Sequence, residues 1–568
     1  MSRPAPPEGA GSGQTVVEEE VSPDAPGGVR VARLLGLLRQ GPTLGSHLTI
    51  AALLAVILGI CLRMGIVPTR SYVSDVIAFA ENGWRLMWGL RPHADFSSGL
   101  GPVALLPWAL GLKAAGGSLN GLGYGISGAG IAIGVWAYAL LARRVSGWLA
   151  VAGAAMLCLL AVAPVQLGES FRLSAIAMSY NREGYALLGL LIMESFPLRQ
   201  AEGERGLGGA FSTGAVCAIL LFLKANYFLV GLVMAAVSLV WNGRLEWRRA
   251  AGVAAGFTVV ALPFLAYLRF DAGAMVADLR MAASARGGAL SPAFVAQVFA
   301  ENFPGFLILA GLAATATMAV RPAARRGWVG TGLLVRPLLL AAMVYVAGVL
   351  LLVTNCQLER LPMHELLALL FVDCILQCAW LDARHAAVLA MMGIGSIAGA
   401  QSADPLALAN GLRLKLHPPR EFAYPVSSGG YAGAIFVDDY LENKGTHRAY
   451  GNFLALYLRD GMDLLRRNLK PGEKVTTMDM FNPFPFALGI EPPNRGMLSA
   501  SYKVFFSDRI HLSADAFFGN ADVVMYPKEH EVPDENWQGL VKYYIPEMER
   551  RFVQVAESAQ WKMYRRRK

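Results

Sequence analysis

Residues 121–142 have the sequence GLGYGISGAGIAIGVWAYALLA and contain no Asp, Glu, Lys or Arg. Four further charge-free runs occur along the chain, at 145–168, 225–243, 302–320 and 337–358. An apolar run of about 18 or more residues is long enough to cross the hydrocarbon core of a membrane as a helix. The pattern therefore predicts a polytopic α-helical membrane protein, and it excludes a soluble enzyme, a fibrous protein and an outer-membrane barrel.

The composition of the whole chain supports this fold class. Of the 568 residues, 55% are hydrophobic and only 16% are charged, whereas soluble domains carry roughly 25% charged residues. The net charge of +9 comes from Lys and Arg gathered in short loops between apolar runs, which is typical of cytoplasmic loops. The six cysteines show no CxxC or Cys/His spacing, so the sequence predicts no metal site.

The apolar pattern predicts about eleven membrane spans, or twelve if residues 103–117 also cross. We favour an interfacial helix for 103–117, because Arg143 and Arg144 then fall on the cytoplasmic side. The spans are expected near 48–62, 121–142, 147–166, 184–198, 207–223, 227–241, 250–269, 303–320, 332–353, 365–381 and 386–402.

Composition divides the chain into three parts. Residues 1–44 are rich in Pro, Gly and Glu and are predicted to form a disordered cytoplasmic tail. Residues 45–402 are the transmembrane domain, with a first outer loop at 68–102. Residues 403–568 alternate a helical pattern with short β-like runs, which predicts a soluble extracytoplasmic α/β domain. An odd number of spans places this domain outside a bacterial-type inner (plasma) membrane, with the N-terminus in the cytoplasm.

The strands of this domain are expected at 474–480, 521–526 and 552–555, the last pairing with 561–564, after a helix at 447–469.

The first outer loop carries an unusual set of polar residues. Asp75 follows the first span, and the segment GLRPHADFSSGLGP at 89–102 includes Asp95. An acidic residue at the mouth of the first helix can act as a general base at the membrane–water boundary. The alternative for each carboxylate is a solvated loop residue.

This arrangement resembles the first outer loop of GT-C glycosyltransferases, most closely over residues 70–145. The family includes protein O-mannosyltransferases and the aminoarabinose transferase of lipid A. The resemblance implies inverting transfer of a sugar from a polyprenyl-phosphate donor to a hydroxyl of an envelope glycan, lipid or protein. By position, Asp75 matches the family's essential acidic residue and Asp95 its second acidic position. Ser74 and Val76 flank Asp75, so the family's acidic pair is missing and a metal-independent reaction without a cofactor is expected.

A phosphate leaving group requires cations at the outer leaflet. Lys224 and Arg182 stand at predicted outer ends of spans, and Arg172 lies in the same loop as Arg182. Arg360 precedes Leu361-Pro362 and loosely resembles the family's Arg-Tyr-x-x-Pro segment, without the Tyr. All four are candidate donor-phosphate ligands. The alternative is that these long side chains reach lipid headgroups.

Two alternative hypotheses for the function remain open. Asp373 lies near the middle of the run from Leu366 to Trp380, where an ionised carboxylate is costly. It is expected to make a buried polar contact between helices, or to serve as the coupling site of a transporter or lipid flippase. A catalytically inactive family member acting as a binding scaffold is a third possibility. The sequence identifies neither the sugar nor the acceptor.

Overall fold

The computed structural model describes residues 36, 40–195, 207–241, 247–285, 291–324, 330–355, 357, 360–377, 383–427, 429–438, 450–529 and 534–567. Of the tail predicted for 1–44, only residues 36 and 40–44 lie within these ranges.

Within the described residues, every region that the sequence predicts to be a membrane span overlaps a helix. Five stretches within the described residues are long and apolar enough to cross a membrane, in α2, α5, α10, α12 and α13. The prediction of a polytopic α-helical membrane protein is confirmed. The helices are α2 (Leu44–Met64), α5 (Gly121–Leu141), α6 (Gly147–Val162), α7 (Ser179–Ser195), α8 (Leu207–Leu223), α9 (Ala225–Trp241), α10 (Trp247–Tyr267), α12 (Pro292–Ala324), α13 (Gly330–Thr354), α14 (Pro362–Leu376) and α15 (Ala383–Gln401).

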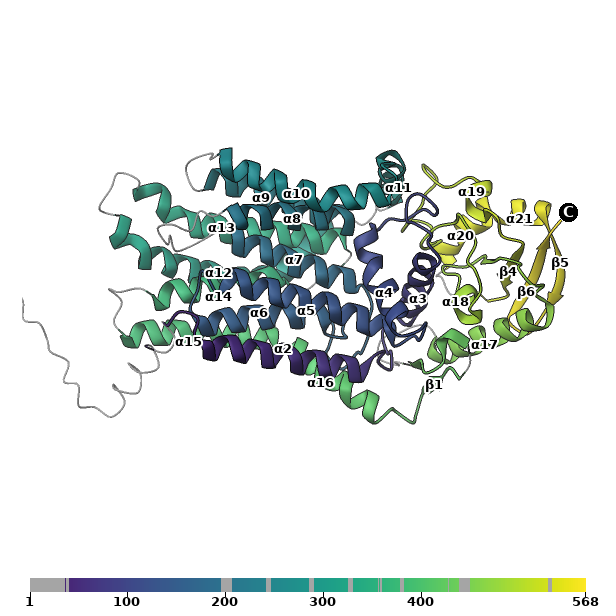
Figure 1. Ribbon diagram of the computed structural model, residues 1–568, viewed down its shortest axis with the longest axis horizontal. Helices are drawn as coiled ribbons and strands as arrows, with labels where there is room; N and C mark the ends of the chain where they lie inside the picture. Colours follow the sequence, from purple (N-terminus) through teal and green to yellow (C-terminus); the bar gives the residue numbers. More distant parts are fainter. Residues whose placement is uncertain are drawn as a thin grey trace, which may run out of the picture.

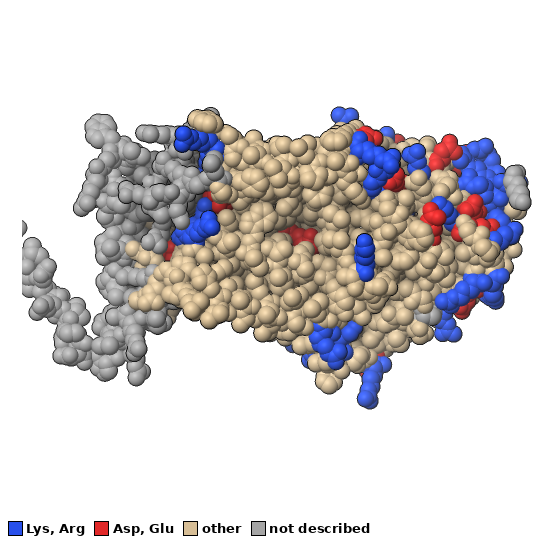
Figure 2. All heavy atoms as spheres, in the orientation of Figure 1, with Lys and Arg blue, Asp and Glu red and all other residues tan. Residues whose placement is uncertain are grey.

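These helices form a bundle along the long axis of the molecule, and the C-terminal domain lies at one end of it (Figure 1). We call this end of the bundle the domain-facing end. Figure 2 shows that the middle of the bundle is almost free of charged side chains on the visible face, whereas Lys, Arg, Asp and Glu gather toward both ends of the molecule. An uncharged band of this kind suits contact with lipid hydrocarbon, where exposed charges are costly.

The region 103–117 forms a short helix, α4 (Pro102–Ala114). Thirteen residues rise only about 20 Å, which is less than the roughly 30 Å hydrocarbon core. A Cβ atom at Gly125 would lie 1.7 Å from the carbonyl oxygen of Pro107, so glycine is required where α4 packs against α5. The length of α4 favours the interfacial interpretation over a twelfth span.

Three more helices, α3 (Val73–Met87), α11 (Ala272–Ala285) and α16 (Ala403–Leu416), lie toward the domain-facing end (Figure 1). α3 is the short amphipathic helix expected in the first outer loop, and its Trp84 indole nitrogen donates to the carbonyl of Ile490 in the C-terminal domain at 2.9 Å. α16 packs against α2, since a Cβ at Gly411 would lie 2.7 Å from Met64 Sδ. These helices connect the bundle to the domain.

The C-terminal domain contains the predicted α/β pattern. β3 (Val475–Thr477), β4 (Val523–Pro527), β5 (Phe552–Glu557) and β6 (Trp561–Arg566) form one sheet in the order β3-β4-β6-β5. β3 pairs with β4 in parallel, and the other pairs, including the expected hairpin of β5 and β6, are antiparallel. α17 (Tyr450–Asn468) covers the sheet, with the rings of Tyr457 and Trp561 4.1 Å apart.

A second, two-stranded sheet attaches the domain to the loop after α2. β1 (Ala423–Pro425) pairs with β2 (Ile435–Val437), and η1 (Gly429–Tyr431) lies between them. Thr69 exchanges backbone hydrogen bonds with β2, to Ile435 O and from Val437 N, both at 2.9 Å. The remaining elements of the domain are the short helices α18 (Phe484–Leu488), α19 (Ala514–Phe518), α20 (Asp534–Tyr543) and α21 (Ile545–Arg551).

Candidate functional site

The first turn of α7 collects polar contacts from several parts of the chain. Met178 precedes this helix with a positive φ of 50°, and its backbone N–H donates to Asp75 Oδ2 at 3.2 Å. Asp75 is the third residue of α3 and is half-buried. Burial raises the pKa of its carboxyl group to about 7, and the hydrogen bond from Met178 limits the rise. The carboxylate is therefore poised to exchange a proton near neutral pH.

Lys224 reaches the same turn from the junction of α8 and α9. Its Nζ donates to Asn181 Oδ1 at 3.0 Å and to Asn355 Oδ1 at 2.7 Å, and it lies 5.1 Å from the centre of the Tyr180 ring. Asn226 Nδ2 donates to the same Asn355 oxygen at 3.0 Å, which fixes the orientation of that amide. The ammonium group is held by amide oxygens and an aromatic face. Asp75 and Lys224 therefore both contact residues 178–181.

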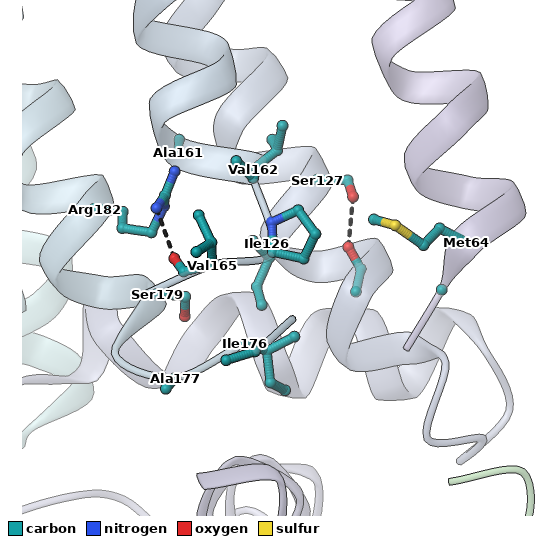
Figure 3. Close-up of a pocket in the computed structure, with 15 residues that line it drawn as sticks. Met64, Ile126, Ser127, Ala161, Val162, Val165, Ile176, Ala177, Ser179 and Arg182 are labelled. Atoms are coloured by element: carbon teal, nitrogen blue, oxygen red, sulfur yellow. Dashed lines mark hydrogen bonds between the residues drawn. The ribbon is translucent and has the colours of Figure 1, made fainter. Parts of the chain in front are cut away.

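Arg182, in the next position of α7, is almost fully buried. Its Nε and Nη1 donate to the carbonyls of Leu160 and Val165, both at 2.7 Å, and its Nη2 donates to Asp404 at 2.6 Å. Figure 3 shows the bond to Val165 beside a small pocket that Arg182 and Ser179 help to line. Every nitrogen of this guanidinium is engaged within the protein, so its charge acts mainly through Asp404.

Arg360 borders a cavity of about 550 Å³ between α12, α14, α15 and the loop before α7. Its Nη1 and Nη2 donate to Asp404 at 3.0 and 2.5 Å, whereas its Nε has no hydrogen-bond partner. Its wall combines polar and apolar side chains. The lining includes the polar residues Glu169, Glu301, Asn302, His364 and Glu365 and the apolar residues Ile308, Leu309, Ala368 and Ile397. A cavity lined by both polar and apolar side chains fits an amphiphilic ligand.

The two other predicted site residues are held elsewhere. Asp95 forms an ion pair with Arg91 at 2.9 Å, and its backbone oxygen accepts from Arg495 N at 2.7 Å. Burial of Asp95 is outweighed by the bonds from Arg91, which hold the pKa of Asp95 below its ordinary value. Arg172 is exposed, with its guanidinium 5.8 Å from the centre of the Phe171 ring. Asp95 ties the first loop to the C-terminal domain, while Arg172 lies at the surface.

The position of Asp373 differs from the mid-span location predicted for it. α14 ends at Leu376, so Asp373 lies in its last turn, where Oδ1 accepts from Ser146 N at 3.1 Å. Ser146 caps the start of α6, a helix of 16 residues and therefore about 24 Å long. Because Val165 and Arg182 lie beyond the other end of α6, Asp373 is at the opposite end of the bundle from Asp75. The expected buried contact between helices is confirmed.

Sequence reasoning missed Asn355 and Asp404. Asn355 lies near the end of the charge-free run 337–358, and Asp404 comes just after the apolar run 386–402. A polar residue at such a boundary is the one sequence signal that could have identified them. Among the described residues, no group of three His, Cys, Asp or Glu side chains is arranged to hold a metal ion.

No protein-family model and no curated protein sequence matches this chain. The chain is similar to the crystal structure of ArnT from Cupriavidus metallidurans bound to undecaprenyl phosphate, with 13% identity over 92% of this chain and 98% of that chain and a TM-score of 0.43. It is also similar to ArnT from Cupriavidus metallidurans in the apo state, with 14% identity over 90% of this chain and 97% of that chain and a TM-score of 0.42. At such identities, the roles of individual residues in this chain rest on its own geometry.

Proposed function

We propose that this protein is a membrane glycosyltransferase. It moves a sugar from a polyprenyl-phosphate donor to a hydroxyl of an envelope glycan, lipid or protein, with inversion at the sugar and without a metal. The observation that carries the proposal is the convergence of Asp75 and Lys224 on residues 178–181. A proton acceptor and a cation held at one helix turn are what such a transfer requires.

Asp75 is the proposed general base. With a pKa raised to about 7 by burial, a large fraction of the carboxyl groups is ionised at neutral pH, and the group is basic enough to accept a proton from an attacking hydroxyl. The acceptor oxygen forms its bond to the anomeric carbon while the bond to the phosphate oxygen breaks. The phosphate leaves with the electron pair, and a single displacement of this kind inverts the configuration.

Lys224 and Arg360 are the proposed ligands of the leaving phosphate. A positive charge near the phosphate oxygens stabilises the negative charge that develops there as the glycosyl bond breaks. Arg360 lines the cavity, whose apolar residues on α12 and α15 suit a prenyl chain. Arg182 contributes through Asp404, Arg172 approaches the headgroup region from the surface, and Asp95 maintains the first loop.

The proposed setting is a bacterial inner membrane with the N-terminus in the cytoplasm and the domain-facing end outside. The C-terminal domain, proposed to comprise 403–568, then covers the site and contributes to selecting the acceptor, and the transmembrane domain comprises 45–402.

The test compares envelope glycolipids and polysaccharide by mass spectrometry from cells with the intact gene, its deletion, Asp75→Asn and Asp508→Asn. Asp508 is an exposed carboxylate of the C-terminal domain and serves as the control. We expect deletion and Asp75→Asn to lose the same sugar, and Asp508→Asn to retain it. If deletion removes a sugar and Asp75→Asn does not, Asp75 is not the base. If deletion changes no envelope sugar, the proposed function is wrong.

A further inference from the structure

Asp404, the second residue of α16, is completely buried and lies between two guanidinium groups. Its Oδ1 accepts from Arg182 at 2.6 Å and from Arg360 at 3.0 Å, and its Oδ2 accepts from Arg360 at 2.5 Å. The pair with Arg360 is bidentate, with two nitrogens of one planar group bound to two oxygens of one carboxylate. This geometry fixes the plane of the guanidinium as well as its position.

The two arginines differ in what remains available to a ligand. Arg182 has 2% of its side chain exposed, and two of its nitrogens bind backbone carbonyls. Arg360 has 12% exposed and lines the cavity of about 550 Å³. Its Nε is buried without a hydrogen-bond partner and forms a long ion pair with Glu365 Oε1 at 3.8 Å. Arg360 is therefore the member of the cluster that can meet a bound group.

The backbone at Arg360 makes an external support necessary. Its φ of 75° lies in the left-handed region, which costs a non-glycine residue free energy unless its surroundings impose the conformation. Both Nη atoms of this side chain are bound to Asp404, which fixes how the guanidinium lies at the cavity wall. Asp404 supplies this support from α16.

The charges of Arg182, Arg360 and Asp404 also indicate that Asp404 holds Arg360 in place. The two arginines and one carboxylate carry a net charge of +1, and Arg182 and Arg360 keep the pKa of Asp404 below its ordinary value despite its burial. Asp404 thus suppresses the repulsion between two buried cations, and the Glu365 carboxyl group lies 3.8 Å from Arg360 Nε on the cavity side. A neutral residue in place of Asp404 would leave two guanidinium groups free to move apart.

We propose that Asp404 is a positioning residue for donor binding: it orients the guanidinium group of Arg360 at the wall of the cavity that receives the donor phosphate. This inference rests on the proposed function, because it takes a polyprenyl phosphate as the ligand.

The test measures equilibrium binding of undecaprenyl phosphate to the purified full-length protein, together with its melting temperature. The variants are Asp404→Asn, Arg360→Gln, the double variant of these two, and Asp373→Asn as the control. Asp373 is also a buried carboxylate, with 2% exposed, but it caps α6 at the other end of the bundle. A carboxylate with a purely structural role should behave like Asp373.

We expect Asp404→Asn to weaken binding by about tenfold or more, the scale for loss of one charge-assisted hydrogen bond. Asp373→Asn should lower the melting temperature and leave the affinity within about twofold of the wild type. In the double variant, Asp404→Asn should weaken binding no further than Arg360→Gln alone, because Asp404 acts through Arg360. The effect of Asp404→Asn on the melting temperature should persist when Arg360→Gln is also present.

Unchanged or tighter binding by Asp404→Asn overturns the proposal while the proposed function stands. Additive losses in the double variant overturn it as well, because Asp404 would then act independently of Arg360. If Asp404→Asn fails to fold, Arg360→Lys takes its place, since it keeps the charge but cannot form the bidentate pair; retained affinity in Arg360→Lys overturns the proposal. If the wild type does not bind undecaprenyl phosphate, the proposed donor is wrong and the inference falls with it.

Discussion

The Asp75 carboxylate accepts a hydrogen bond from the Met178 backbone nitrogen at 3.2 Å, one residue before α7 begins. Asp75 belongs to the first loop and Met178 to the loop between α6 and α7, so this contact joins segments separated by 103 positions. It places the carboxylate at the helix turn that also receives Lys224 through Asn181. The chemistry proposed for the protein depends on this meeting of the first loop with α7.

The pH dependence of sugar transfer is the first prediction. Asp75 acts as a base only when it is ionised, and burial raises the pKa of its carboxyl group to about 7. The transfer rate should therefore increase as the pH rises through about 7 and then level off. Transfer by purified protein in proteoliposomes, measured from about pH 5.5 to 8.5 with the donor saturating, checks this. A rate independent of pH over that range contradicts the role of Asp75.

The stability of Asp75→Asn gives a second prediction that does not depend on the reaction. The pKa of Asp75 is higher in the folded protein than its ordinary value of 3.8, so ionisation of this group opposes folding. The cost is absent below about pH 4, develops as the pH rises toward 7 and is complete above 7. Asp75→Asn should therefore have a higher melting temperature than the wild type at about pH 8, and the difference should shrink toward pH 5. An equal or lower melting temperature at the higher pH contradicts the raised pKa.

Lys224 is the subject of the third prediction. Lys224→Met removes the ammonium group held by Asn181 and Asn355, so binding of undecaprenyl phosphate should weaken by about tenfold or more, while Lys224→Arg retains part of the affinity. Lys113→Met is the matched control, because Lys113 is an exposed lysine in the last turn of α4 and should leave binding unchanged. Equal affinities for Lys224→Met and Lys113→Met would mean that Lys224 interacts with lipid headgroups and does not bind the donor phosphate.

The helices of the bundle could be predicted from the sequence because a helix in contact with lipid hydrocarbon is built from apolar residues, which form a long apolar run. The hairpin of β5 and β6 could also be predicted, because its two β-like runs lie close together in the sequence and only a short turn joins them. The location of Asp373 could not be predicted, since α14 ends at Leu376 and no Gly or Pro marks that end in the sequence.

The candidate site was predictable in part. Asp75 and Lys224 could be named because a charged residue at the end of an apolar run is unusual, and Arg360 because its segment loosely resembles the Arg-Tyr-x-x-Pro segment of GT-C glycosyltransferases. The engagement of Arg182 by two backbone carbonyls and by Asp404 could not be predicted. Its partners lie 17 to 222 positions away in the sequence, and such contacts depend on how the helices pack.

The last prediction concerns the connection between the first loop and the C-terminal domain. Glu81 and Arg85 of α3 form a buried ion pair at 2.6 Å, with 2% and 3% of their side chains exposed. Glu81 Oε2 also accepts from Asn482 N at 2.8 Å, and Arg85 Nη1 donates to the carbonyl of Arg495 at 3.2 Å. Each member of the pair therefore holds the C-terminal domain as well as its partner.

Glu81→Gln should destabilise the protein by about 3–5 kcal/mol, because it leaves the buried Arg85 without its countercharge. Asp508→Asn breaks an exposed ion pair with Lys542 and should leave the melting temperature unchanged. Limited proteolysis should show earlier cleavage between the bundle and the domain in Glu81→Gln than in the wild type or Asp508→Asn. If Glu81→Gln melts and is cleaved like Asp508→Asn, the ion pair does not hold the domain, and the backbone bonds between Thr69 and β2 are sufficient for its attachment.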